Sequence, residues 1–513
     1  MSHDLELKFA VGPAFVLPDL TGAGSVARMQ AVPSRELRST YYDTVDRRLA
    51  RWGITLRHRT GDGDRLPWTL RLPLPTSAAA AAAAGDGVRP GSRSEVEVEG
   101  PPDVVPAMLA DLVTAHARSH PLTAAAFLAT QRTGWRLVAF DGQVLAELTT
   151  DDVLIMDGEE VTSQFTELEL EARRASPDDL AAVSARLIAA GAVGAAPVPK
   201  AIRALGPGAS GLPDVVLREF LPEDAAGWAV RAALADGLLR IVKHDPGTRL
   251  GDEEALHQMR VGVRRLRSDL RTVRRLLGPD WAPGLNADLK RLGGLLGTVR
   301  DLDVLLTHLV STHGDLMTPL GPMLTDLRRR HATARTVLLE EMRSDRYAQL
   351  LERLVVLARD PELSAAGLEP AGDVLPALAE KSWRRLERQA DKIAARPHPT
   401  DAELHAVRIA AKRARYGAEL AARGLPPDRA EGARGLATEL AGLQDLLGAH
   451  QDAVVAVAET HAAATAHDGD LELILAAGRV IERELQAAHD GRSRFADTWR
   501  SVSRPRLRRW MEP

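Results

Sequence analysis

Charged and apolar residues alternate strictly in several short segments of the first part of the chain. Examples are residues 4–8 (DLELK) and 167–171 (ELELE). Because side chains of a β-strand point to opposite faces with a period of two, each segment would place charge on one face and aliphatic carbon on the other. The alternation therefore predicts a sheet with one polar face and one face that packs under helices.

The same pattern predicts further strands separated by turn-like segments. Strands are expected at residues 3–10, 53–60, 66–73, 93–99, 133–140, 143–150 and 164–172, and helices at 102–117 and 177–190. The alanine-rich stretch at 76–94 is interpreted as a loop. So many strands in one domain of about 200 residues favour an antiparallel β-barrel that is closed or nearly closed.

A different organisation follows this region. Residues 206–213 (GPGASGLP) have the composition of a linker, and from about Pro222 the apolar residues recur at helical spacing. At 513 residues the chain is too long for one ordinary core. We therefore predict an α+β protein: a barrel domain at 1–205, a linker at 206–221, and an all-α domain of roughly eight to ten helices at 222–513.

Composition narrows the functional classes. The chain has no cysteine, which excludes disulfides and thiolate metal sites. It shows no apolar run of membrane-spanning length and no charged-then-apolar leader, so a cytoplasmic location is expected. Its net charge is only −4, so any site for a polyanion must come from local clustering.

The helical region contains an internal repeat. His257-x-x-Arg260-x-x-x-Arg264-Arg265-x-Arg267 corresponds to His405-x-x-Arg408-x-x-x-Lys412-Arg413-x-Arg415 at an offset of 148 residues. Residues 296–301 (LGTVRD) correspond to 447–452 (LGAHQD) at an offset of 151. Two helical bundles that face each other across a pseudo-twofold axis are the natural inference.

One face of the first repeat helix is strongly basic. An apolar stripe is expected at residues 259, 263, 266, 270, 273 and 277, and a basic stripe at 257, 260, 264, 267, 271 and 274. Asp269 is the only acid between residues 257 and 275. A solvated face is the alternative, but acids normally alternate with bases there. We favour a positive groove for a linear phosphate chain, whose binding would weaken steeply with salt.

The charged strands of the first region carry both signs. Carboxylate oxygens suit Mg²⁺ or Mn²⁺, and arginines supply forked donors for phosphate oxygens. An ordinary sheet with one wet face is the alternative interpretation. If the sheet closes, these side chains line an aqueous lumen that is a poor core but suits a metal ion and a polyphosphate.

Residues 1–205 resemble the CYTH group of triphosphate tunnel enzymes, which begin with a Glu-x-Glu-x-Lys strand. Similar elements follow in the expected order: Tyr42-Asp43-Thr44, Leu56-Arg57-x-Arg59, Trp68-Thr69-Leu70-Arg71, Glu95-x-Glu97, Arg132-x-x-Trp135, Glu167-x-Glu169-x-Glu171 and Pro199-Lys200-x-x-Arg203. The sequence departs from the group at Asp4, where glutamate is usual, at Arg71, where lysine is common, and at Pro199, where a small polar residue is more usual.

The resemblance implies a metal-dependent triphosphatase. Metal ligands would be Asp4, Glu6, Glu169 and Glu171, and the triphosphate would be bound by Lys8, Arg57, Arg59, Arg71, Arg132, Lys200 and Arg203. Of these, Glu6, Lys8 and Glu169 form the expected catalytic set. Mg²⁺ or Mn²⁺ is the implied cofactor, and inorganic tripolyphosphate the implied substrate.

Residues 222–513 resemble the CHAD domain, a helical module associated with inorganic polyphosphate. The implied polyphosphate-binding residues are His257, Arg260, Arg264, Arg265, Arg267, Lys290, Arg300, His405, Arg408, Lys412, Arg413 and Arg415. Protonation of His257 or His405 beside a polyanion would add to the attraction. The resemblance also suggests association with polyphosphate granules.

Three functions remain open from the sequence. The first is hydrolysis of tripolyphosphate, with a helical domain that binds longer polyphosphate. The second is polyphosphate binding without turnover, and the third is hydrolysis of an organic triphosphate or cyclisation of ATP. Nucleic-acid binding is disfavoured because aromatic residues make up only 4% of the chain, too few for base stacking along the basic stripes.

Overall fold

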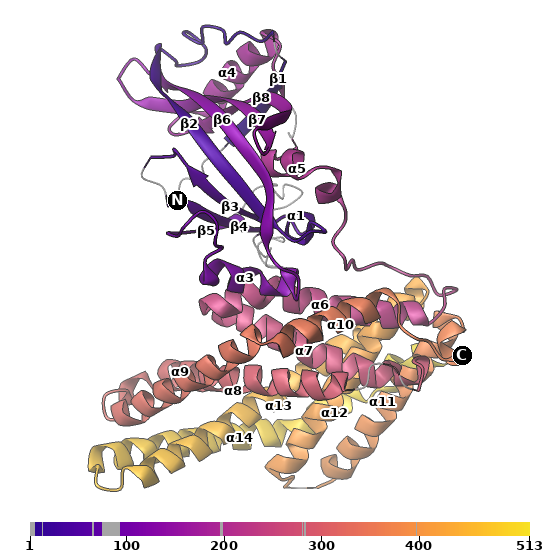
Figure 1. The fold of residues 1–513 in the computed structure, drawn as a ribbon. Coiled ribbons are helices and arrows are strands. Elements are labelled where there is room, and N and C mark those ends of the chain that lie inside the picture. The colour runs from indigo at the N-terminus through magenta and orange to yellow at the C-terminus, as the bar shows by residue number, and fades with distance from the viewer. Residues whose placement is uncertain are drawn as a thin grey trace. The chain divides into compact units, whose positions relative to one another are not determined.

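The computed structural model describes residues 6–12, 14–63, 66–73, 93–194, 198–279, 281, 284–396 and 398–512. Two compact units are present, Met1–Asp214 and Val215–Pro513. The first combines strands with short helices and the second is helical (Figure 1), which confirms the α+β class. The predicted linker at 206–221 spans the division between the units and contains one 3₁₀ turn, Pro207–Ser210.

The first unit is built on one nine-stranded antiparallel sheet in the order β5-β4-β3-β2-β6-β7-β8-β1-β9. The strands are β1 (Glu6–Val11), β2 (Arg28–Asp43), β3 (Thr55–Thr60), β4 (Trp68–Pro73), β5 (Arg93–Val98), β6 (Thr123–Val138), β7 (Val144–Asp157), β8 (Glu160–Ala172) and β9 (Val193–Gly194). Within the described residues no pairing joins β5 to β9. Closure into a barrel therefore stays a prediction.

The long strand β2 was not predicted, and β6 and β7 are longer than expected. Pro33 interrupts the middle of β2, where the pairing with β6 shifts register between Val32 and Arg35. A proline removes a backbone donor and hides a strand from pattern analysis, although a bulge accommodates it. The predicted helices are present as α3 (Ala107–Ala117) and α4 (Pro177–Ala189).

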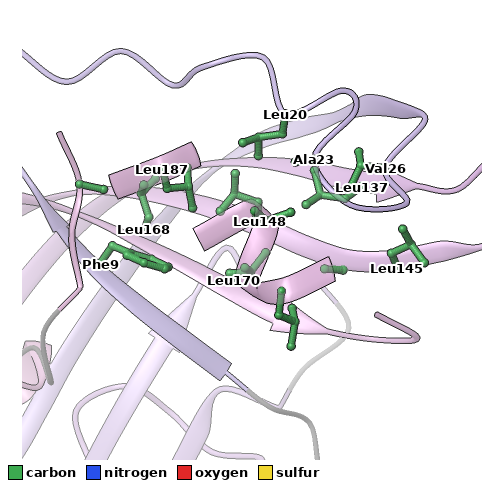
Figure 2. Packing of buried hydrophobic residues seen from close by; sticks show 14 residues of the cluster. Phe9, Leu20, Ala23, Val26, Leu137, Leu145, Leu148, Leu168, Leu170 and Leu187 are labelled. Atoms are coloured by element: carbon green, nitrogen blue, oxygen red, sulfur yellow. The ribbon is translucent and has the colours of Figure 1, made fainter. Parts of the chain in front are cut away.

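The apolar face of the sheet packs against α4. Leu168 and Leu170 of β8 and Leu148 of β7 are buried together with Leu187 of α4 (Figure 2). The helix begins at a capping box formed by Ser176 and Asp179, which fixes where the chain turns onto the sheet. This burial leaves the opposite side chains of the same strands on the polar face.

The second unit consists of long helices. They are α6 (Gly227–Leu250), α7 (Glu253–Thr272), α8 (Leu285–Thr312), α9 (Gly321–Arg343), α10 (Asp345–Arg359), α11 (Ala371–Ala394), α12 (Asp401–Ala421), α13 (Pro427–Ala466) and α14 (Leu471–Val502). All six positions of the apolar stripe predicted from Met259 are buried. The α-helix is shorter than expected, because α7 ends at Thr272 and Val273 begins a 3₁₀ turn. None of the described helices is long and apolar enough to cross a membrane.

The internal repeat corresponds to two helix pairs, α7 with α8 and α12 with α13. Asp252 caps α7, and Thr400 forms a capping box with Glu403 at the start of α12. These caps satisfy free backbone N–H groups and start both basic helices at equivalent places, five residues before His257 and His405.

Candidate functional sites

The register of β1, β8 and β7 gathers charge on the polar face of the sheet. Lys8 lies opposite Glu169, and Glu6 lies opposite Glu171. On the other side of β8, Glu171 faces Glu147, and Glu167 faces Asp151. Cross-strand neighbours of this kind have their β-carbons about 5 Å apart, so the sheet itself brings these charges together.

Glu169 accepts contacts from three cations. Lys8 Nζ lies 2.7 Å from Glu169 Oε1 and 2.9 Å from Glu6 Oε1. Lys200 Nζ lies 3.2 Å from Glu169 Oε1, and an Arg132 nitrogen lies 3.4 Å from Oε2. The structure thus brings Glu6, Lys8, Arg132, Glu169 and Lys200 together.

Asp151 is the buried centre of this cluster. Its side chain is 1% exposed and accepts two hydrogen bonds from Arg132, of 2.7 and 2.6 Å. It also pairs with Lys200, whose ammonium lies 2.9 Å from Glu167. Lys200 reaches the cluster because it is the first residue of α5 (Lys200–Leu205), which packs onto the sheet through Ala201 and Leu205.

Burial and neighbouring cations shift the titration of these groups. Although burial opposes ionisation, Lys200 and Lys8 hold the pKa of Glu169 well below its usual range. Burial lowers the pKa of Lys8 and Lys200, but the neighbouring carboxylates together outweigh it and raise both pKa values. These carboxylates are Glu169 and Glu6 for Lys8, and Glu169, Asp151 and Glu167 for Lys200. Burial instead raises the pKa of Glu167. The pKa values of two carboxylates on one strand are therefore shifted in opposite directions.

A row of acids lies at one end of the polar face. Glu6, Glu171 and Glu147 occupy facing positions on three adjacent strands, and Arg173 lies 2.9 Å from both Glu171 and Glu147. The side chains of Glu6 and Glu171 are 45% and 37% exposed, so their oxygens are accessible. Exposed carboxylate oxygens of this kind suit a hard divalent cation that keeps several waters, although the described part of the chain does not bring three of these acids within coordinating distance of one another. Asp4 lies outside the described residues.

The other predicted triphosphate-binding arginines have separate surroundings. Arg57 is buried on β3, and burial together with nearby Arg59 lowers its pKa to about 10. Arg59 pairs with Asp62, and Arg71 with Glu95. The guanidinium of Arg203 instead stacks 4.0 Å above the ring of Phe165.

In the helical unit, basic residues of the two repeats lie close together. Arg260 and Arg264 of α7 interact electrostatically with Arg408 and Lys412 of α12, and we call these four residues the basic cluster. Burial and the three arginines lower the pKa of Lys412 to about 7. Burial and neighbouring arginines also lower the pKa of His257, so the expected histidine charge is disfavoured in the free protein.

Each repeat places an arginine beside a glycine. A Cβ added at Gly297 of α8 would lie 3.7 Å from Nε of Arg260, and one added at Gly448 of α13 would lie 3.8 Å from a terminal nitrogen of Arg408. The missing side chains let both guanidinium groups lie close to the neighbouring helix. The equivalence extends to the acids. Burial lowers the pKa of Arg260 and of Arg408, and Asp301 and Asp452 oppose these shifts without reversing them.

The remaining predicted polyphosphate-binding residues are spread more widely. Arg265 pairs with Asp236 at 3.3 Å, Glu419 at 2.8 Å and Asp269 at 3.5 Å, so its charge is already balanced. Lys290 is exposed on α8, and Arg267 lines a cavity of about 440 Å³. Four other residues have these neighbours: Arg300 near His257, His405 against Gln451, Arg413 near Arg271 and Arg415 against Glu419.

Comparisons with known proteins agree with these two architectures. Residues 2–190 match the CYTH domain family and residues 232–461 match the CHAD domain family. Two uncharacterised proteins of Mycobacterium tuberculosis, from strains CDC 1551 / Oshkosh and ATCC 25618 / H37Rv, are each 31% identical over 481 residues, which cover 88% of this chain and 87% of the relative. The chain therefore belongs to the proteins in which a CYTH domain is followed by a CHAD domain.

Solved structures resemble part of the chain. PptA from Streptomyces chartreusis is 23% identical with a TM-score of 0.44, and the match covers 54% of this chain and 99% of that chain. The CHAD domain of the plant Ricinus communis is 27% identical with a TM-score of 0.44, and the match covers 54% of this chain and 95% of that chain.

Proposed function

We propose that the CYTH domain hydrolyses inorganic tripolyphosphate with a divalent metal ion, inside a sheet that closes into a tunnel. The CYTH family includes triphosphate tunnel metalloenzymes with triphosphatase activity. The observation that carries the proposal is the convergence of Lys8, Arg132 and Lys200 on the polar face beside a row of acids. Cations and oxygen donors are both needed to bind a metal–triphosphate complex.

The residues have distinct roles in this proposal. Lys8, Arg132 and Lys200 would exchange their carboxylate contacts for phosphate oxygens and stabilise the charge that develops during phosphoryl transfer. Glu6, Glu169 and Glu171 would hold Mg²⁺ or Mn²⁺, which supplies charge neutralisation and orientation of phosphate oxygens. Arg57, Arg59, Arg71 and Arg203 would extend the binding site along the substrate.

The test is phosphate release from tripolyphosphate with Mg²⁺ or Mn²⁺. We expect Glu169→Gln to lower kcat/KM by about 100-fold or more, since it removes a charged group from the centre of the site. Glu160→Gln is the matched control, because it makes the same change at an exposed position of the same strand. Absence of turnover by wild type with either metal, alongside retained polyphosphate binding, would instead support the non-enzymatic function.

We further propose that the CHAD domain binds inorganic polyphosphate through the basic cluster. Support comes from the lowered pKa of Lys412 and Arg260. Burial is the largest cause and repulsion from neighbouring arginines adds to it, so a bound anion would offset the repulsion. Arg260→Glu combined with Arg408→Glu should abolish retention on immobilised polyphosphate. The control is Arg434→Glu combined with Arg494→Glu, which changes the same charge at exposed positions. Unchanged retention of the first variant would place the binding site elsewhere.

A further inference from the structure

Two histidines and a glutamate meet where the first repeat contacts the last long helix. His308 lies in the final turns of α8, His313 follows the end of that helix, and Glu484 lies on α14. The Nε2 atoms of His308 and His313 lie 2.8 and 2.6 Å from the same oxygen, Oε1 of Glu484. Ligand atoms of the three residues lie within 4.8 Å of one another.

The three side chains are largely shielded from solvent, so their polar atoms need partners within the protein. The side chain of His313 is fully buried, that of Glu484 is 2% exposed, and that of His308 is 30% exposed. The second carboxylate oxygen, Oε2 of Glu484, is buried without a hydrogen-bond partner among the described residues. A buried carboxylate oxygen without a partner is costly, so this atom has an unused capacity to bind a cation.

Further charged groups surround the three side chains. Asp452 of α13 adds a further negative charge near His308. Arg483 lies 3.5 Å from Nδ1 of His313, but both oxygens of Asp315 balance its charge at 2.9 Å.

We propose that His308, His313 and Glu484 bind one divalent transition-metal ion, with Zn²⁺ as the best fit. Two imidazole nitrogens and a carboxylate oxygen are a common ligand set for zinc, which takes ligands at about 2.0–2.2 Å in tetrahedral geometry. Such ligand atoms lie about 3.3 Å apart, so the side chains separate by about 0.5 Å when the ion enters. A water molecule completes the coordination from the partly exposed side of His308.

The ion would join parts of the chain that are distant in sequence. Glu484 is separated from His313 by 171 residues and from His308 by 176. Leu305, Leu309 and Val480, which flank the ligands in sequence, belong to one buried apolar cluster. Because the ligands project from a packed scaffold, binding stabilises the folded state. The proposal is independent of the activities proposed above.

The experiment uses the full chain, stripped with a chelator and titrated with Zn²⁺ in excess Mg²⁺, which saturates sites made of carboxylates alone. We expect one zinc per chain, an increase in Tm, and Co²⁺ absorption typical of nitrogen–oxygen ligation. His308→Gln and Glu484→Gln should each weaken zinc binding at least tenfold. Circular dichroism of the stripped proteins checks the fold. Should Glu484→Gln fail to fold, His308→Gln at its partly exposed position decides the outcome.

His331→Gln is the matched control. His331 lies 2.7 Å from Asp303 and forms a similar histidine–carboxylate pair, and in the described part of the chain no second histidine pairs with Asp303. It should retain wild-type zinc binding. Failure of the wild type to bind zinc, or binding that His308→Gln leaves unchanged, would overturn the proposal.

Discussion

The polar face of the sheet and the basic cluster of the helices both gather cations, but they balance them in opposite ways. On the sheet, Lys8 and Lys200 contact several carboxylates, which together raise the lysine pKa values despite burial. In the helices, burial and neighbouring arginines lower the pKa of Lys412 to about 7. The charged form of a lysine side chain is thus stabilised on the sheet and destabilised in the basic cluster.

This difference suggests two ways to bind phosphate. A phosphate that binds on the sheet must replace existing ion pairs, which limits its affinity. The same ion pairs hold each cation in a defined position before the phosphate binds. Binding at the basic cluster relieves repulsion that already exists. Arg260 would still exchange its ion pair with Asp301, whose carboxylate oxygen lies 3.0 Å away. The first arrangement suits chemistry on a short substrate, and the second suits retention of a long one.

The largest expected effect comes from removing charge at the centre of the sheet site. Asp151→Asn leaves Arg132 and Lys200 without their buried partner and should lower the free energy of unfolding of the CYTH domain by about 3 kcal/mol. Asp152→Asn is the control, because this neighbour is exposed and accepts a bond from Thr166. Equal effects in urea denaturation would mean that Asp151 is not a buried structural anion.

The same carboxylate predicts the response to acid. Burial opposes its ionisation, but Arg132 and Lys200 lower the pKa of Asp151 below its ordinary 3.8. Its stabilising contribution is therefore complete above pH 3.8 and is lost as the pH falls through the lower folded value. Wild type should lose more stability than Asp151→Asn over this range, which parallel denaturation curves would measure.

Removing a cation from the basic cluster should change the free energy of unfolding in the opposite direction and stabilise the domain. Lys412→Gln relieves repulsion from four arginines and should stabilise the CHAD domain by about 1 kcal/mol, while it weakens polyphosphate binding. Denaturant unfolding and retention on immobilised polyphosphate measure the two effects. A destabilised variant would show that the cluster is not under repulsion and would remove the contrast with the sheet.

A smaller effect is expected from the pH dependence of polyphosphate affinity. Because the pKa of Lys412 is about 7 in the free protein, its charge is lost above neutral pH and must be restored when a polyanion binds. Polyphosphate affinity should fall several-fold between about pH 6 and pH 9, and Lys412→Arg should flatten this dependence. An identical profile for both proteins would assign the pH effect to other groups.

The smallest effect concerns the glycines beneath the arginines. Gly297→Ala and Gly448→Ala add a Cβ at ordinary contact distance from Arg260 and Arg408. Each should stabilise its helix by about 0.5–1 kcal/mol and leave polyphosphate retention unchanged. Replacement of both by leucine should displace the guanidinium groups and reduce retention. Equal retention in the leucine variant would show that close approach of the arginines is unimportant.

Sequence alternation found the charged strands β1, β3, β4, β5 and β8, but it missed β2 and did not show which strands pair. It identified Glu6, Lys8 and Glu169, which meet in the structure. It missed Asp151 as a site residue, although alternation with Glu147 was a usable signal, because strand register decides that Asp151 faces Arg132. Register depends on pairing across the whole sheet and cannot be read from one strand.

The helical region shows the same limit. Spacing on α7 predicted the buried stripe, because helical period alone determines which residues share a face. Spacing could not show that the charge of Arg265, unlike that of its neighbours, is balanced by acids, since Asp236 and Glu419 lie on the other helices α6 and α12. The meeting of His308 and His313 with Glu484 likewise depends on packing between helices distant in sequence.

The pairing of an arginine with a glycine has a consequence for comparing the two repeats. Arg260 and Gly297 are 37 residues apart, whereas Arg408 and Gly448 are 40 apart. Between α7 and α8 the connection is long, but α12 and α13 are joined by a short one and α13 starts earlier relative to its glycine. An alignment of the two copies should therefore be anchored on both arginine–glycine pairs, with its gap placed in the connection, rather than on uniform spacing.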